Sequence, residues 1–207
     1  TMPVKEWERV YKLSFLILSL YNLRIAFLPM VFLNKHHSIK ITELVEFIIK
    51  HVSEESSAYP TFSKAIEHLN KQTKLIVNGV SSVSETENSE GVVFTPHEAT
   101  TFIFSSYLDE TYNELHKILK KYVREKNIDV NELFLEESIF FQKLMIPSFI
   151  SGKSTKVFKT NAPYSLYKLV TEDKNIELKK VKNSVSIYNP KHEFDNLVEF
   201  NRRRVSS

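Results

Sequence analysis

The sequence predicts a mainly α-helical fold: five to six helices packed as an irregular bundle, with a small C-terminal antiparallel two- to three-stranded unit. Before Pro147, apolar residues recur at the helical spacings of three and four. Glycine is scarce, with 3 residues in 207, and this disfavours sheets joined by tight turns. After Gly152 the apolar residues alternate, as in a strand. We therefore expect a helical domain over residues 1–150 and a strand-rich appendage with a terminal helix over residues 151–207.

The longest apolar run in the chain covers residues 7–33 and is long enough to cross a bilayer. Arg24 lies within it, and an arginine at the centre of a membrane span costs about 2.5–3.5 kcal/mol. Pro29 would kink or end a helix. We therefore predict a buried helix of a soluble domain, broken near Leu28 and Pro29, and no membrane partner.

Four helices are expected in the first 77 residues. The first begins at residue 4 or 5 and runs to about residue 27. One of its faces is marked by apolar and small residues at helical spacing: Trp7, Val10, Tyr11, Ser14, Leu18, Tyr21 and Ile25. A shorter helix follows Pro29 and ends at the polar residues 36–38. Two more helices are predicted over residues 42–51 and 61–70.

A loop rich in Ser, Glu and Asn is predicted over about residues 78–92. A sharp helix start follows, because Thr95 can cap, Pro96 suits the first helical position, and Glu98 completes a capping box. This helix is expected to run to about residue 126.

The next helix opens at Asp129 or Asn131 and is stopped by Pro147. Beyond it, alternating residues predict strands over 156–160, 176–180 and 184–188, and a final helix over 191–200. Asn183 and Ser184 lie between the last two strands and suggest a hairpin turn.

Composition excludes several classes of chemistry. The chain has no cysteine, so it cannot form disulfides, thiolate metal sites, iron–sulfur ligation or a cysteine nucleophile. This fits a reducing compartment, and we expect the cytoplasm. The net charge of +3 comes from 28 basic and 25 acidic residues, which is too balanced to indicate nucleic acid as a partner.

No motif predicts a metal or phosphate site. None of the histidines falls in an H-E-x-x-H motif or pairs with another at i, i+4: His36, His37, His51, His68, His97, His116 and His192. His37 with Glu43, or His51 with Glu54, would form a site only if the tertiary fold brought them together. Residues 151–155 (SGKST) resemble the end of a P-loop, but Pro147 stands where that loop needs its first glycine. We expect no cofactor bound by this chain alone.

Short stretches, taken in order, resemble the helical C-terminal region of cobalamin-dependent radical S-adenosylmethionine enzymes. They are EWERVY (6–11), SLYNL (19–23), TPHEA (95–99), YNEL (112–115), FQK (141–143), VF (157–158), PYSLY (163–167) and FDNLVEF (194–200). The order and rough spacing cover nearly the whole chain.

The resemblance implies a non-catalytic accessory or C-terminal domain that packs on a radical barrel and helps shape its substrate pocket. It carries over no catalytic residue, because the cysteines of the family's iron–sulfur motif and its cobalamin-binding D-x-H-x-x-G motif are absent. The residues predicted to contact a partner protein are Trp7, Tyr21, Tyr112, Tyr164, Tyr167, Arg202, Arg203 and Arg204.

Two other functions stay open at this stage. The chain could be a free-standing helical module that binds a protein or peptide in a groove between helices. It could also be a small hydrolase or transferase using histidine and carboxylate residues, which requires a His–Asp or His–Glu pair converging in a pocket.

Overall fold

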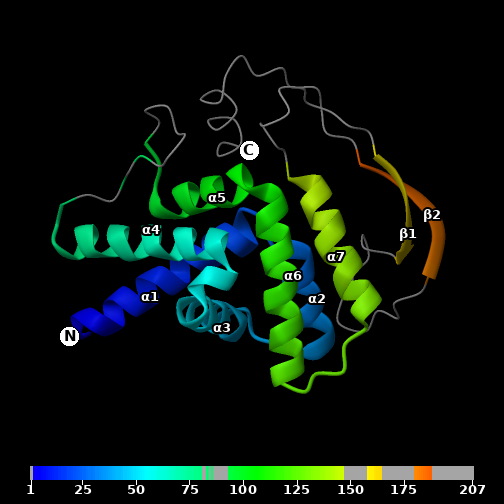
Figure 1. Cartoon of the computed structure of the whole chain (residues 1–207), viewed down its shortest axis with the longest axis horizontal. Coiled ribbons are helices and arrows are strands. Elements are labelled where there is room, and N and C mark those ends of the chain that lie inside the picture. The colour runs from blue at the N-terminus through cyan, green and yellow to red at the C-terminus, as the bar shows by residue number, and fades with distance from the viewer. Residues whose placement is uncertain are drawn as a thin grey trace, which may run out of the picture.

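The computed structural model describes residues 2–80, 83, 85 and 93–146, and the backbone of two later strands. The helices of the described residues are α1 (Val4–Ile17), the π-helical η1 (Leu18–Asn22), α2 (Phe27–His37), α3 (Ile41–Glu54), the 3-10 turn η2 (Ser56–Ala58), α4 (Pro60–Val77), α5 (Pro96–Ser106), α6 (Leu108–Glu125) and α7 (Glu132–Met145) (Figure 1). The predicted mainly helical fold is confirmed. The described residues alone form seven α-helices, against five to six expected for the whole chain.

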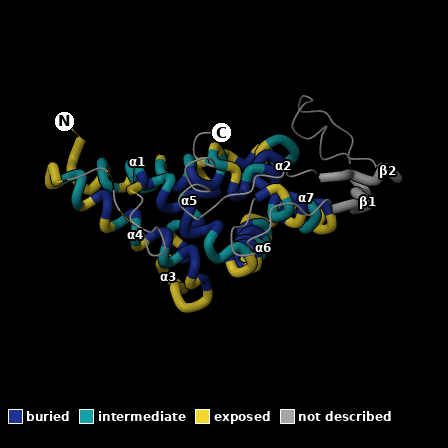
Figure 2. The backbone as a smooth tube through the Cα atoms, turned by 90° about the horizontal axis from the view of Figure 1, so that it is seen from above, coloured by how far each residue is buried: buried dark blue, intermediate teal, exposed yellow. Residues whose placement is uncertain are grey.

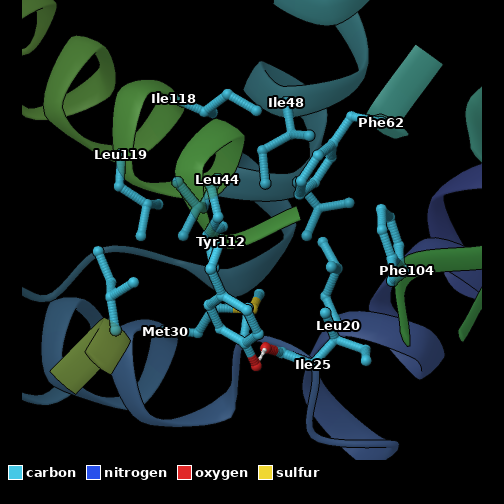
Figure 3. Close-up of a cluster of buried hydrophobic side chains, with 14 of the residues drawn as sticks. Leu20, Ile25, Met30, Leu44, Ile48, Phe62, Phe104, Tyr112, Ile118 and Leu119 are labelled. Carbon is cyan, nitrogen blue, oxygen red and sulfur yellow. Dashed lines mark hydrogen bonds between the residues drawn. The ribbon is translucent and has the colours of Figure 1, made fainter. Parts of the chain in front are cut away.

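The helices pack around one main core, and Phe94, Ala99 and Phe102 form a second, smaller cluster. α2 packs against α7, α4 against α5, and α1 against both α3 and α4. Figure 3 shows a part of this core where side chains from six elements meet: Leu20, Ile25, Met30, Leu44, Ile48, Phe62, Phe104, Tyr112, Ile118 and Leu119. Burial of these aliphatic and aromatic groups is the main stabilising contribution to such a fold.

The long apolar run folds as two helices with a sharp turn between them. α1 with η1 and α2 meet at 99°. No single described helix is long and apolar enough to span a membrane, although this bent pair meets the length and composition criteria when taken together.

The turn lies at residues 23–26, so the predicted break near Leu28 and Pro29 was wrong. Arg24 adopts a left-handed conformation there, with φ of 61°. Pro29 is the third residue of α2. Backbone N–H groups in the first turn of a helix have no intrahelical acceptor, so a proline there removes no hydrogen bond.

Side chains from α6 and α7 hold this turn. The Tyr112 hydroxyl donates to the Ile25 carbonyl at 2.6 Å (Figure 3). The Gln142 amide makes two bonds: its Nε2 donates to the Arg24 carbonyl at 2.6 Å, and its Oε1 accepts from the Leu28 N–H at 2.8 Å. Gln142 therefore satisfies backbone groups on both sides of the turn.

Two helix starts that the sequence predicts are confirmed. The Thr95 N–H donates to Glu98 Oε2 at 2.8 Å, which is one half of a capping box. Asn131 is the N-cap of α7, and its Oδ1 accepts from the Phe134 N–H at 3.1 Å. Each of these caps joins residues three positions apart, so it forms without contacts from distant parts of the chain.

The single helix predicted from Thr95 to about residue 126 was wrong. The helix is interrupted at Tyr107, which separates α5 from α6. Ser106 Oγ donates to the Phe102 carbonyl at 2.8 Å, and Thr111 Oγ1 donates to the Phe104 carbonyl at 2.7 Å across the break. Hydroxyl side chains that bond to nearby carbonyls offer the backbone an alternative to the helical ladder.

A buried carboxylate holds the start of α4. Glu114 of α6 is 4% exposed. Its two oxygens accept from the backbone N–H groups of Thr61 and Phe62, each at 2.9 Å. Tyr59, in the N-cap position of α4, makes no side-chain capping bond, so Glu114 takes that role from another helix.

The two described strands, β1 (Phe158–Tyr164) and β2 (Lys180–Ile187), pair antiparallel, with an irregularity between Ala162 and Tyr164. Asn183 and Ser184 lie inside β2, so the predicted hairpin turn is not found there. The boundary at residue 150 and the complete strand unit stay predictions. The loop over 78–92 and the helix over 191–200 lie mostly or wholly outside the described residues.

We predict that Gln142→Leu lowers the free energy of unfolding by about 2–3 kcal/mol, because it leaves two backbone groups at the turn without their partner. Gln72→Leu is the matched control. Gln72 is also buried, but its Oε1 has no hydrogen-bond partner among the described residues, so its loss is expected to be neutral or stabilising. Urea denaturation measures both. Equal destabilisation by the two substitutions would contradict the role given to Gln142.

Glu114→Gln is expected to lower the free energy of unfolding by about 1–3 kcal/mol, because an amide offers one acceptor oxygen to two N–H donors. Glu110→Gln, at an exposed position one turn earlier in α6, is the control and is expected to change little. Hydrogen exchange locates the effect: the first amides of α4 are predicted to exchange faster in the Glu114 variant alone. Unchanged exchange there would refute the capping role.

Candidate functional site

The outer face of α1 and η1 is the candidate site. We use this name for Trp7, Val10, Tyr11, Ser14, Leu18 and Tyr21. The apolar run was predicted to be buried, yet Leu16 is the one buried residue of α1. Val10 is 44% exposed and the aromatic members of the face are half-buried. In Figure 2, α1 is accordingly teal and yellow along most of its length.

The physical reason for this difference is that α1 is apolar on two sides. Leu16 and, in η1, Leu20 are fully buried and point into the core. Residues of the outer face repeat at the same helical spacing on the opposite side. Periodicity shows that a helix has an apolar stripe but cannot show which of two stripes meets the other helices.

Three aromatic rings of α1 form a continuous row that ends on α5. The Trp7 and Tyr11 rings stack with centroids 4.4 Å apart, and Tyr11 meets Phe15 edge-on at 4.3 Å. Phe15 then stacks on the His97 ring at 5.8 Å. Such contacts fix ring orientations before any partner arrives, so little side-chain entropy remains to be lost on binding.

The charged residues of α1 lie on other sides of the helix than Trp7. At about 100° per residue, every charged position of α1 lies about 100° or more from Trp7 around the helix axis: Lys5, Glu6, Glu8, Arg9 and Lys12. Arg9 forms an ion pair with Glu46 of α3. The outer face therefore combines aromatic side chains with an absence of charge, which is the composition of the centre of a protein–protein interface.

His97 joins the row to the start of α5. Its Nδ1 lies 3.3 Å from Thr95 Oγ1, and its carbonyl accepts from Ser19 Oγ at 2.8 Å. Burial lowers the pKa of His97, and the nearby Glu98 only partly opposes this. The imidazole is therefore neutral at pH 7, which suits its stacking on Phe15.

The other predicted interaction residues do not gather at this face. Trp7 and Tyr21 belong to it, and Tyr21 also contacts Phe27 at 5.1 Å. Tyr112 is 3% exposed and bonded to Ile25, so it supports the turn and offers no surface to a partner. Tyr164 is placed only as a backbone position of β1. Tyr167, Arg202, Arg203 and Arg204 lie outside the described residues.

One histidine–carboxylate cluster was missed by the sequence reasoning, which paired His51 with Glu54. The buried His51 Nε2 lies 3.5 Å from Glu55 Oε2 and 3.3 Å from the Tyr59 hydroxyl. Lys121 of α6 pairs with Glu55 at 2.6 Å, and this hydrogen bond lowers the pKa of Glu55. The i, i+4 spacing of His51, in the last turn of α3, and Glu55, its C-cap, was the available signal.

Within the described residues, no three histidine or carboxylate side chains lie together in a way that could hold a metal ion. A second histidine–carboxylate pair joins His116 of α6 to Glu136 of α7, with Nε2 and Oε1 3.5 Å apart, and Lys120 pairs with the same oxygen at 2.7 Å.

Comparison of the chain with family models, curated proteins and solved structures finds no match. The outer face of α1 and the buried His51 cluster are the two features from which we argue a function.

The half-buried histidines predict a loss of stability in mild acid. Burial lowers the pKa of four of them below 6.5: His36, His37, His68 and His97. The unfolded chain then binds protons more readily than the folded chain. The free energy of unfolding is therefore highest above pH 6.5 and falls as the pH drops through the folded-state pKa values.

The measurement is urea denaturation between about pH 7.5 and about pH 5.5, a window above the carboxylate range. His97→Asn is expected to flatten this pH dependence, since it removes one of the four groups. An unfolding free energy that stays constant or rises on acidification would contradict the account.

Proposed function

We propose that this chain is a non-catalytic helical domain that binds another protein through the outer face of α1. The observation that carries the proposal is a helix with one buried residue, Leu16, on which the half-buried Trp7 and Tyr11 rings stack along a side that carries no charged residue. Aromatic residues that are rigid before binding are the commonest energetic anchors of protein interfaces. Their exposure in a lone chain is unfavourable, and a partner surface would remove it from water.

The proposed partner is the barrel of a cobalamin-dependent radical S-adenosylmethionine enzyme, in a separate chain or in another part of a longer protein. The ordered sequence resemblance supports this choice, and two of its pieces, EWERVY and SLYNL, contain Trp7, Tyr11 and Tyr21 of the outer face. On this proposal the domain helps to shape the substrate pocket of the barrel. Binding of an unrelated protein by the same face is the alternative outcome.

A hydrolase or transferase is the second candidate, favoured by the His51–Glu55 pair beside Tyr59. A histidine beside a carboxylate can act as a general base. The test is turnover of activated esters and phosphate esters by the purified chain, with His51→Ala as the negative control. Absence of turnover by the unsubstituted chain rejects this candidate.

Binding to the radical enzyme is measured by calorimetry, with the enzyme's iron–sulfur cluster intact and oxygen excluded. Trp7→Ala and Tyr11→Ala are each expected to raise the Kd about tenfold or more, as truncation of an interface anchor does. Tyr107→Ala is the matched control, since this tyrosine lies between α5 and α6 and its hydroxyl contacts Lys64 of α4. It is expected to leave the Kd unchanged.

Two results would count against the proposal. If the unsubstituted chain shows no heat of binding to the radical enzyme but binds another protein through Trp7, the partner is wrong. If the three substitutions weaken binding equally, or none weakens it, the outer face is not the interface.

A further inference from the structure

α7 carries a second exposed apolar surface, on the side turned away from the core. Its core side is buried through Phe134, Ile139 and Phe141. Leu133 and Phe140, seven residues apart on the other side, are 58% and 49% exposed. Leu144, four residues further on, continues the same line. We call Leu133, Phe140 and Leu144 the outer side of α7.

We infer that the outer side of α7 is the docking site for the β1–β2 ribbon of the same chain. This inference does not depend on the proposed function, because it concerns another surface and another partner. It would make the C-terminal part of the chain a packed layer of the helical domain.

The first support is the register of the ribbon. Phe158 pairs with Ile187, and Thr160 with Val185. Alternate positions of a strand share one side, so the apolar positions of both strands fall on the same side of the ribbon. A two-stranded ribbon is only marginally stable alone and needs an apolar surface to cover that side.

The second support is tethering. Eleven residues, 147–157, separate Ile146 from Phe158. Even fully extended, they span at most about 40 Å, so the start of the ribbon stays within that distance of the end of α7. A short tether makes docking intramolecular, at a high effective concentration compared with a free partner.

Charge gives the third support. α7 holds three glutamates and one lysine, a net charge of −2, while β1 and β2 together hold three lysines and no acidic residue, a net charge of +3. Lys120 of α6 already pairs with Glu132 and Glu136 of α7. The remaining opposite net charge favours association of α7 with the ribbon and disfavours pairing of one α7 with another.

Cysteine crosslinking tests the docking of the ribbon on α7. Only the introduced cysteines can form a disulfide, because the chain has no native cysteine. The test pair is Phe140→Cys with Val185→Cys, and the control pair is Phe140→Cys with Ser186→Cys, the next position along β2 on its other side. Under mild oxidation the test pair is expected to form an intramolecular disulfide about tenfold faster than the control. Equal rates, no crosslink, or crosslinks only between two molecules would overturn the inference.

Hydrogen exchange gives a second readout that needs no crosslink. Phe140→Asp places a charge on the outer side of α7, and exchange of the β1 and β2 amides is expected to become about tenfold faster. Val10→Asp makes the same kind of change on α1 and is expected to leave those amides unaffected. Far-UV circular dichroism checks that both variants keep the helical fold. Unchanged exchange in the Phe140 variant would overturn the inference even if the cysteine pairs behave as expected.

Discussion

The sharp turn between η1 and α2 is the constraint on which the rest of the structure depends. Its carbonyls and N–H group are held by Tyr112 of α6 and Gln142 of α7, residues 87 and 118 positions away from their partners. The turn directs α2 into the core, where six consecutive residues are buried, and leaves α1 at the rim with one buried residue. The same three hydrogen bonds thus separate a core helix from a surface helix within one apolar run.

The placement of α1 at the rim explains why its second apolar stripe is not buried in the core. α1 cannot turn its second stripe inward, because Arg9 is paired with Glu46 and Leu16 already lies in the core. Apolar surface left in water costs roughly 25 cal/mol per Å². We propose that a row of aromatic side chains in that position serves binding, for which the stacked geometry of Trp7 and Tyr11 suits an anchor.

Helix ends that are fixed by neighbouring residues were predictable from the sequence, whereas helix ends that are fixed by residues far away in the sequence were not. The caps at Thr95 and Asn131 use residues within three positions. The sequence alone therefore located the first of these helix starts and limited the second to Asp129 or Asn131. The break at Arg24 depends on Gln142, and the cap of α4 depends on Glu114, so neither could be inferred from nearby residues. The break at Tyr107 had only a weak signal in the preceding serines.

The candidate site was predictable in part for the same reason. Spacing identified the stripe that holds Trp7 and Tyr21, but spacing could not show that this stripe faces outward. His97 was assigned only to a helix start, since its contact with Phe15 links residues 82 positions apart. Tyr112 was chosen by resemblance and proved to be a core residue, because a short motif does not distinguish a buried tyrosine from an exposed one.

The most direct test of the central claim uses Trp7, the single tryptophan of the chain. Its fluorescence reports on the outer face of α1 and on no other site. In the isolated chain, we predict efficient quenching of this fluorescence by acrylamide. Adding the proposed partner, a cobalamin-dependent radical S-adenosylmethionine enzyme, is expected to protect Trp7 and shift its emission to the blue. Emission from the isolated chain that is already blue-shifted and resistant to acrylamide would contradict the account, because the face would then be covered without a partner.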